Sequence, residues 1–86
     1  MTEKPADRLA RLRMRSWRRG TREMDLILGP YADRALSGLT PSELDAYEAV
    51  LSENDQDLYL WITRPDSAPA AHERVLWRIR SHRGLC

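Results

Sequence analysis

The chain has 86 residues and a formal net charge of +1, and 42% of its side chains are hydrophobic, so it can form one small domain with one core. Its only cysteine is the last residue, Cys86, which excludes an intramolecular disulfide and a cysteine-rich zinc site. No apolar run reaches the ~20 residues of a membrane helix, and the N-terminus lacks the hydrophobic stretch of a secretory signal. We therefore expect a cytoplasmic monomer that inserts into no membrane, with a single domain over residues 1–86 and frayed termini at about 1–5 and 83–86.

Charge is strongly segregated along the chain. Residues 1–22 hold eight basic and two acidic side chains, a balance of +6, whereas residues 23–63 hold one basic and nine acidic side chains, a balance of −8. The remaining residues hold five basic and two acidic side chains and return +3. Such a dipolar chain could orient a partner during encounter. The basic first segment could equally lie against the acidic middle of the chain, and the charge pattern alone leaves both interpretations open.

Glycine, proline and polar clusters divide the chain into short helical segments, and no segment shows the sustained alternation of a strand. The first predicted helix runs from about Ala6 to Arg18. Leu9, Leu12 and Trp17 lie on one broad side of it, where we expect the core. Gly20 then interrupts the helix.

The second predicted helix has an apolar stripe at the spacing i, i+3, i+4, i+7. The stripe consists of Met24, Ile27, Leu28 and Tyr31. Gly29-Pro30 falls inside it, and because proline removes a backbone donor and crowds the preceding turn, we expect a kink or a short break there. Residues 32–36 continue the helix as far as Ser37-Gly38.

The third predicted helix has the clearest start signal in the chain. Thr40 is the N-cap, Pro41 takes the first helical position, and Glu43 completes a capping box. Leu39 and Leu44 occupy the two positions of a hydrophobic staple. The buried stripe of this helix is predicted to be Leu44, Tyr47 and Leu51.

Two further helices complete the predicted fold. The fourth begins at Asn54 or Asp55 and buries Leu58, Trp61 and Ile62. After a turn at residues 64–67, the fifth runs from about Pro69 to His82 and presents to the core Val75, Leu76 and Ile79, with Trp77 at its flank. The predicted fold class is all-α: a compact five-helix bundle in one small domain.

The chain has none of the residue constellations of a small enzyme. His72 and His82 lie on different faces of one predicted helix, and neither has a second ligand at metal-binding spacing. Cys86 lies on a tail where no base can be held against it. The glycines occur singly, so no loop can cradle a phosphate. We therefore predict a protein that is not an enzyme and binds no metal.

Nucleic-acid binding is the alternative class of function. The basic first helix, which contains Trp17, has the charge that a nucleic-acid-binding helix needs. The acidic stretch that follows would repel phosphates on any neighbouring face, and no basic recognition helix follows a tight turn. We expect no nucleic-acid partner and keep a nucleic-acid-binding regulator as the alternative.

Residues 18–23, hereafter the Arg-Gly corner, join the first two predicted helices. A structural interpretation is adequate, because Gly20 follows a helix end, where it can adopt positive φ, and the flanking charges complement the two helix dipoles. The corner also suits recognition of a partner. Gly20 lets a partner backbone approach closely, Arg19 offers a planar fork to a carboxylate or carbonyl, and Glu23 adds an acceptor. The sequence leaves both interpretations open.

Two blocks of the sequence occur at a defined spacing. The first is Ser16-Trp17, then Arg19-Gly20-x-x-Glu23 and Met24-Asp25, with an apolar run and Pro30-Tyr31 after it. The second is residues 51–61, in which an acidic Asp55-x-Asp57-Leu58 precedes an aromatic residue and a tryptophan. Together they resemble the family of succinate dehydrogenase assembly (flavinylation) factors over roughly residues 8–80. Tyr31 stands where an aromatic residue, often phenylalanine, is usual.

The resemblance implies a five-helix fold and a role in attaching FAD covalently to the flavoprotein subunit of succinate dehydrogenase. It implies that the chain acts as a chaperone and is not the catalyst of this step. Because the chain has no dinucleotide-binding fingerprint, we expect it to bind no FAD stably itself. Whether a fumarate reductase subunit is a second partner stays open. The family also includes proteins described as antitoxins, so an antitoxin-like regulator joins the alternative interpretation.

The family implicates the Arg-Gly-x-x-Glu motif in the contact with the flavoprotein. The resemblance therefore implies partner-binding roles for Arg19, Gly20 and Glu23. We extend the predicted partner-binding patch to a further set, Asp25, Tyr31, Asp55 and Asp57. For the last two, an interaction with the helix dipole is an equally available interpretation, because acidic residues are expected in a first helical turn. Trp17 and Trp61 are predicted to be core side chains.

Overall fold

The computed structural model describes residues 3–83, which form five α-helices joined by short connections. The helices are α1 (Pro5–Trp17), α2 (Arg22–Ala35), α3 (Pro41–Leu51), α4 (Asp55–Thr63) and α5 (Glu73–Arg83). Three 3-10 turns lie in the connections: η1 (Leu36–Gly38), η2 (Pro65–Ser67) and η3 (Ala70–His72). The predicted all-α, five-helix fold is confirmed. Cys86 and most of the predicted frayed termini lie outside the described residues.

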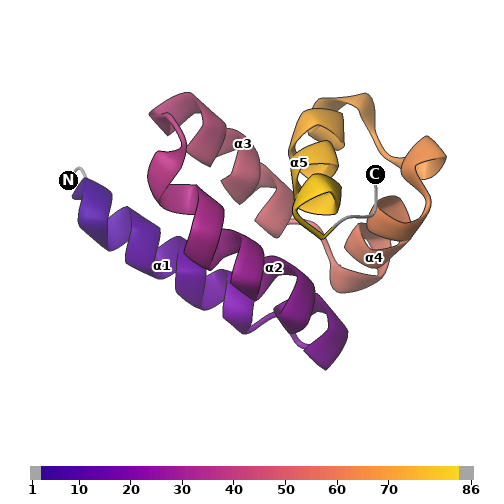
Figure 1. Cartoon of the computed structure of the whole chain (residues 1–86), viewed down its shortest axis with the longest axis horizontal. Coiled ribbons are helices and arrows are strands. Elements are labelled where there is room, and N and C mark those ends of the chain that lie inside the picture. Colours follow the sequence, from indigo (N-terminus) through magenta and orange to yellow (C-terminus); the bar gives the residue numbers. More distant parts are fainter. Residues whose placement is uncertain (1–2, 84–86) are drawn as a thin grey trace.

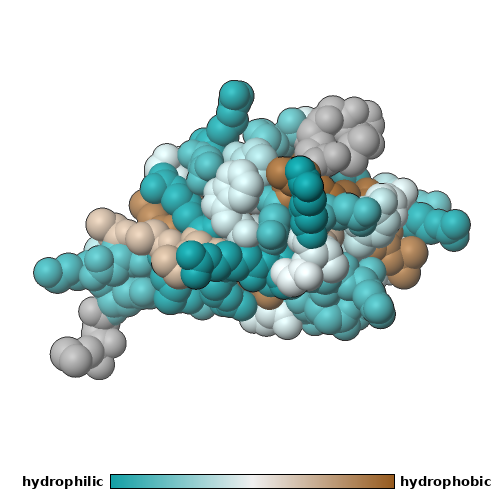
Figure 2. All heavy atoms as spheres, turned by 90° about the horizontal axis from the view of Figure 1, so that it is seen from below, coloured by the Kyte–Doolittle hydropathy of each residue, from teal (hydrophilic) through white to brown (hydrophobic). Residues whose placement is uncertain are grey.

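The five helices pack around one core. α1 and α2 lie side by side as a hairpin, and α5 lies beside α3 and α4 (Figure 1). The fully or nearly fully buried apolar side chains come from every α-helix and from η1: Leu12, Met24, Ile27, Leu28, Tyr31, Ala32, Leu36, Leu44, Tyr47, Val50, Leu51, Leu58, Ile62, Val75, Leu76 and Ile79. The face seen from below is mostly hydrophilic, with apolar colour in limited areas (Figure 2). Within residues 3–83, no helix combines the length and the apolar character that a membrane span needs.

Local side-chain caps set the starts of three helices. Thr40 forms the predicted capping box with Glu43: its backbone amide donates to the Glu43 carboxylate at 2.9 Å, and its hydroxyl accepts from the Glu43 amide at 3.1 Å. Asn54 caps α4 by accepting from the amide of Asp57 at 2.8 Å. The hydroxyl of Thr21 accepts from the amide of Met24 at the start of α2. Each cap satisfies a backbone donor that the first turn of a helix leaves without a partner.

The predicted break at Gly29-Pro30 does not occur, and α2 is continuous through Pro30. The helix persists because its flanking residues Leu28, Tyr31 and Ala32 are buried in the core, and such packing can offset the local cost of an internal proline, about 3 kcal/mol. Gly29 has its own role in packing. A Cβ atom at this position would lie 2.3 Å from the indole ring of Trp17, so only glycine lets α1 and α2 approach this closely.

Trp17 was predicted to be a core side chain, but it is 38% exposed. Its indole lies over Gly29, and the indole nitrogen donates to the Asp33 carboxylate at 3.2 Å. The ring therefore covers the outside of the α1–α2 hairpin. Trp61 is half-buried against the core, and Trp77 is exposed.

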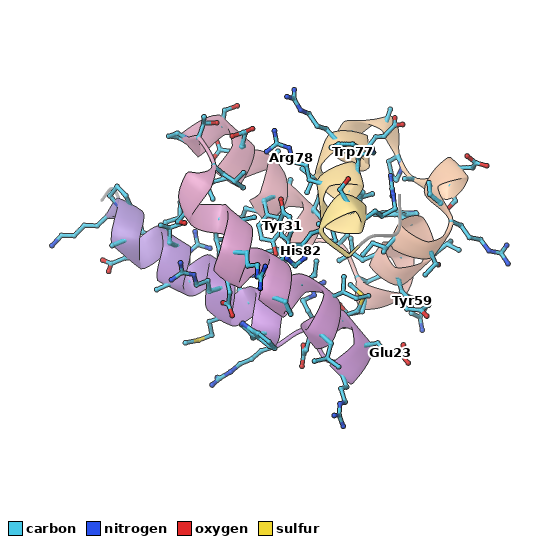
Figure 3. The ribbon with its side chains drawn as sticks, viewed as in Figure 1. Glu23, Tyr31, Tyr59, Trp77, Arg78 and His82 are labelled. Atoms are coloured by element: carbon cyan, nitrogen blue, oxygen red, sulfur yellow. The ribbon has the colours of Figure 1, made fainter. Side chains whose placement is uncertain are left out.

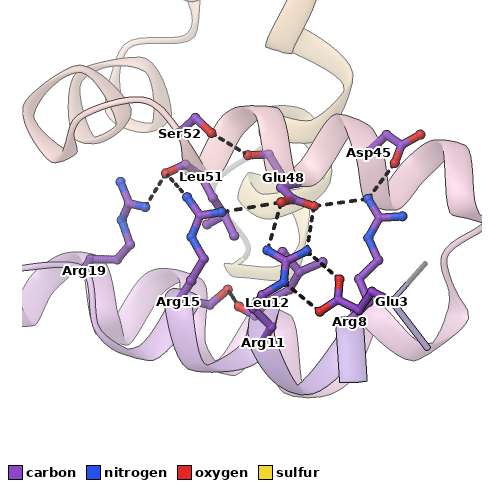
Figure 4. Close-up of polar contacts among 11 residues, drawn as sticks. Glu3, Arg8, Arg11, Leu12, Arg15, Arg19, Asp45, Glu48, Leu51 and Ser52 are labelled. Atoms are coloured by element: carbon purple, nitrogen blue, oxygen red, sulfur yellow. Dashed lines mark hydrogen bonds and ion pairs between the residues drawn. The ribbon is translucent and has the colours of Figure 1, made fainter. Parts of the chain in front are cut away.

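The basic first helix lies against the acidic third helix, as one of the two interpretations of the charge pattern predicted. Glu48 on α3 accepts from Arg8 at 3.2 Å and from Arg11 at 2.9 Å, and it lies 3.8 Å from Arg15 (Figure 4). Arg8 also pairs with Asp45. Much of the segregated charge is thus neutralised inside the molecule.

A buried polar pair also connects α1 to α3. The hydroxyl groups of Ser16 and Tyr47 lie 2.7 Å apart, and the Ser16 hydroxyl donates to the carbonyl of Leu12 at 2.8 Å. Both side chains are fully buried. Burial raises the pKa of Tyr47, so its phenol stays neutral at physiological pH and the pair costs no buried charge.

Candidate functional site

The Arg-Gly corner is built around the one residue with positive φ in the part of the chain that the structure describes. Gly20 has a φ of 135°, a conformation that residues with a Cβ rarely adopt. A Cβ atom there would also lie 3.3 Å from a carboxylate oxygen of Asp55. The corner therefore brings its backbone directly against the start of α4. The positive φ favours glycine there, and the close approach adds crowding for any larger residue.

Arg19 points into the molecule. Its guanidinium donates to the Asp55 carboxylate at 2.8 Å, to the carbonyl of Leu51 at 2.5 Å and to the carbonyl of Glu53 at 2.6 Å. Its side chain is only 10% exposed, and Figure 4 shows it reaching the end of α3. The guanidinium satisfies carbonyls that the end of a helix leaves without partners. The expectation that its planar fork is free for a partner is therefore wrong.

Three of the predicted acidic site residues also serve the structure of the chain. Asp25 accepts from the backbone amide of Arg19 at 2.6 Å, and Asp55 forms the ion pair with the Arg19 guanidinium. Asp57 exchanges hydrogen bonds with Asn54, whose side chain donates to the Asp57 carboxylate at 2.8 Å. These contacts explain the acidic residues of this region without reference to a partner.

Tyr31 is also turned away from any docking surface. Its side chain is 3% exposed, and its ring lies 5.6 Å from the ring of Tyr47 and 5.8 Å from the ring of His82. So small an exposed fraction leaves little of the side chain for a protein partner to contact. The structure therefore assigns Tyr31 to the core, where its position between α2 and α5 explains an aromatic residue at this place.

Glu23 has the opposite environment. It is exposed, and its carboxylate makes no hydrogen bond or ion pair with the side chains that the structure describes. It borders an open groove of about 640 Å³, hereafter the α2–α4 groove. The groove is lined by Thr21, Glu23, Met24, Asp55, Gln56, Tyr59, Leu60, Thr63 and Arg64. Figure 3 shows Glu23 and Tyr59 on the same side of the molecule, one from each wall.

The α2–α4 groove offers apolar surface beside this free carboxylate. Tyr59 is 43% exposed and Leu60 is 42% exposed. Neither was predicted as a site residue, although both fall outside the buried stripe of α4, a signal that was available in the sequence. Exposed aromatic and apolar side chains beside a polar rim are the usual anatomy of a protein–protein contact.

The structure thus divides the seven predicted site residues. Gly20 and Glu23 are exposed, Tyr31 is buried, and the side chains of Arg19, Asp25, Asp55 and Asp57 are engaged in contacts within the chain. The partner-binding role of this set stays a prediction. What the contacts establish is that Arg19 and Asp55 hold the corner in place while Glu23 is left free.

Comparison with known proteins gives one consistent result. The family described as "Flavinator of succinate dehydrogenase" matches residues 10–83. Curated relatives named "Succinate dehydrogenase assembly factor 2, mitochondrial" include that of Debaryomyces hansenii, 47% identical over 64% of this chain and 39% of the relative, and that of Candida glabrata, 42% identical over 76% and 42%. The relative from Yarrowia lipolytica is 39% identical over 84% of this chain and 50% of its own length. The chain spans half or less of the length of these relatives.

These names contradict the predicted cytoplasmic location. The relatives from all three organisms are named as mitochondrial proteins. The prediction rested on composition, on the absence of an apolar signal, and on the judgement that the Arg-rich first segment, with Glu3, Asp7 and little serine, is unlike a mitochondrial transit peptide. None of these properties separates a mitochondrial protein from a cytoplasmic one.

Proposed function

Because this chain belongs to the family of flavinators of succinate dehydrogenase, we propose that it is an assembly factor that binds the flavoprotein subunit of that enzyme and promotes covalent attachment of FAD to it. The observation that carries the proposal is the unpaired, exposed carboxylate of Glu23 beside the exposed Tyr59 and Leu60. An interface needs such a combination of a free charge and accessible apolar surface.

The proposed mechanism is docking of a rigid surface without catalysis by this chain. Arg19 joins the corner to the end of α3 and the start of α4, so Glu23 is presented from a fixed backbone. The flavoprotein docks over the α2–α4 groove and is held in the conformation that is competent for flavin attachment. A factor of this kind accelerates the step only to the extent that it binds the competent conformation more tightly.

The α2–α4 groove is poorly suited to FAD itself. Asp55 in its lining is neutralised by Arg19, and the remaining Glu23 carboxylate and Arg64 guanidinium cancel, so a diphosphate entering the groove would find no surplus positive charge. We therefore propose that FAD is held by the flavoprotein and that this chain contacts protein surface only.

The alternative of a nucleic-acid-binding or antitoxin-like regulator receives less support. Its motivation was the basic first helix, yet Arg8, Arg11 and Arg15 are paired with carboxylates within the chain. A nucleic acid would have to break these ion pairs before these three arginines could contact its phosphates.

The test compares two glutamates in matched settings. Glu23 lies in the first turn of α2 and Glu73 in the first turn of α5, and both are exposed. Glu23→Gln is expected to weaken binding to the purified apo-flavoprotein by about tenfold, because it removes a charge at the centre of the proposed contact. Glu73→Gln is expected to bind like the parent chain.

Binding is measured by titration calorimetry, and covalent flavin is measured by in-gel fluorescence after incubation of the apo-flavoprotein with FAD. The covalent flavin formed in a fixed time should fall with Glu23→Gln and not with Glu73→Gln. Equal binding and equal flavin attachment by the two variants would contradict the proposed site. If the parent chain neither bound the flavoprotein nor changed the amount of covalent flavin, the proposed function itself would be wrong.

A further inference from the structure

A second cavity lies on another side of the molecule from the α2–α4 groove and shares no lining residue with it. Its volume is about 260 Å³, and it lies where α2, α3 and α5 meet. It is lined by Tyr31, Leu39, Ser42, Glu43, Ala46, Tyr47, Ala71, Arg74, Val75 and Arg78. We call it the α5 cavity. Most of this lining is apolar, which favours a ligand with an apolar body.

Tyr31 lines this cavity with a side chain that is almost fully buried. Its side chain is 3% exposed, yet its hydroxyl makes no hydrogen bond with any group that the structure describes. The hydroxyl oxygen is not among the buried polar atoms without a partner in the described residues, so it is accessible to solvent and to a ligand. Figure 3 shows Tyr31 and His82 between α2 and α5, with Arg78 on the side of α5 that faces α3. The cavity therefore contains a donor that the chain itself leaves unused.

The charged groups at the cavity favour an anion. Arg78 pairs with Glu43 at 2.6 Å, and Glu43 also accepts from the backbone of Thr40, so this ion pair contributes no net charge. Arg74 lines the same cavity and makes no ion pair with any side chain in the described residues. One uncompensated guanidinium thus remains beside the apolar lining.

The phenol of Tyr31 is suited to donate a hydrogen bond. Burial raises its pKa, and the nearby guanidinium of Arg78 opposes that shift. The phenol consequently stays protonated at physiological pH and can donate to an acceptor oxygen. A carboxylate oxygen is the acceptor that both a phenol and a guanidinium bind well.

We propose that the α5 cavity is a binding site for a small organic monocarboxylate with a flat apolar body. Arg74 binds the carboxylate, the Tyr31 hydroxyl donates to one of its oxygens, and the apolar body packs among Ala46, Val75 and Tyr47. The cavity volume limits the ligand to about ten non-hydrogen atoms. This site is independent of the proposed docking surface at Glu23.

The test uses benzoate as the probe and benzamide as its neutral isostere. Two-dimensional amide NMR of the full chain during titration with benzoate is expected to show saturable shifts for the residues around the cavity, with a Kd of about 1 mM. Benzamide should produce no saturable shift in the same range, because it offers Arg74 no charge.

Two variants and a matched control locate the binding. Arg74→Gln and Tyr31→Phe are each expected to weaken benzoate binding by about tenfold, because each removes one hydrogen bond to a charged group. Arg22→Gln removes the same charge from an exposed arginine that does not line the cavity, and it should leave the affinity unchanged. The absence of saturable shifts with benzoate, equal binding of benzamide, or unchanged affinity in Arg74→Gln would each overturn the proposal.

Discussion

The α1–α3 interface and the α2–α4 groove use the same kind of residue in opposite ways. At the interface, Glu48 meets three arginines of α1, and every one of these contacts lies within the chain. At the groove, the Glu23 carboxylate forms no hydrogen bond or ion pair in the described part of the molecule, and Tyr59 and Leu60 stay exposed beside it. Both regions therefore contain a glutamate carboxylate. They differ in whether that carboxylate forms ion pairs within the chain.

The Arg-Gly corner lies on the boundary between these two regions. Arg19 belongs to the paired kind, because Asp55 and two backbone carbonyls occupy its guanidinium. Glu23, four residues later in the chain, belongs to the unpaired kind. The motif that suggested a single contact surface thus contains one residue that holds the fold together and one that the fold leaves available. Variants can separate these two roles.

Replacing Arg19 by methionine is expected to cause the largest loss of stability. The variant leaves the Asp55 carboxylate, which is 18% exposed, and the carbonyl of Glu53 without their donor. The carbonyl of Leu51 keeps only the longer hydrogen bond from Arg15, at 3.3 Å. The expected loss is about 3 kcal/mol, a large part of the roughly 4–13 kcal/mol that a chain of this length is expected to have. Urea denaturation followed by circular dichroism measures this loss.

The double variant Arg19→Met/Asp55→Asn provides the control for this prediction. It removes the carboxylate that the single variant leaves unpaired, so its loss of stability should be smaller than the sum of the two single losses. If Arg19→Met were as stable as the parent chain and lost only its affinity for the flavoprotein, Arg19 would belong to the docking surface after all.

Replacing Gly20 by alanine is expected to cost less, about 2 kcal/mol, because it forces a Cβ into a backbone conformation that disfavours it. The new Cβ would also approach the Asp55 carboxylate to 3.3 Å. Gly38→Ala is the matched control, since a Cβ at Gly38 meets nothing within 4 Å. Thermal unfolding of the two variants should therefore give a clear loss at Gly20 and almost none at Gly38. Equal melting temperatures would show that the corner tolerates a side chain.

The helices and their starts could be predicted from the sequence because their causes are local. The capping box of Thr40 and Glu43 joins residues three positions apart, and the observed hydrogen bonds join the same two residues. The apolar stripes of α2 and α3 are local in the same sense, and their predicted members are buried. The predicted break at Pro30 failed because distant packing, which a local rule does not include, offsets the local cost of proline.

The direction of Arg19 could not be predicted for a related reason. Its partners, Leu51, Glu53 and Asp55, lie 32 to 36 residues further along the chain, and only the packing of α1 against the end of α3 brings them together. The same packing places Tyr59 opposite Glu23. The sequence could indicate that the corner is important. Only the tertiary structure shows which of its side chains hold the fold together and which stay exposed.

The smallest expected effect in this comparison comes from the paired charges. Glu48→Gln removes the carboxylate that three arginines of α1 contact, but that side chain is 30% exposed. Ion pairs of this kind contribute little, so we expect a loss of about 1 kcal/mol at pH 7. The loss should shrink further at high salt, because mobile ions screen partly exposed charges.

The pH dependence of this loss tests whether it comes from charge. The hydrogen bond from Arg11, opposed by desolvation, holds the pKa of Glu48 below its ordinary value. A carboxyl whose pKa is lowered by folding stabilises the protein above its unfolded pKa of about 4.3, and this contribution is lost as the pH falls through the folded value. The stability difference between the parent chain and Glu48→Gln, measured by urea denaturation, should therefore be full at pH 7 and should shrink as the pH falls below about 4.3. A stability difference that persisted unchanged in strong acid would mean that the variant disturbs packing. The α1–α3 interface would then be stabilised more by the packing of its side chains than by its ion pairs.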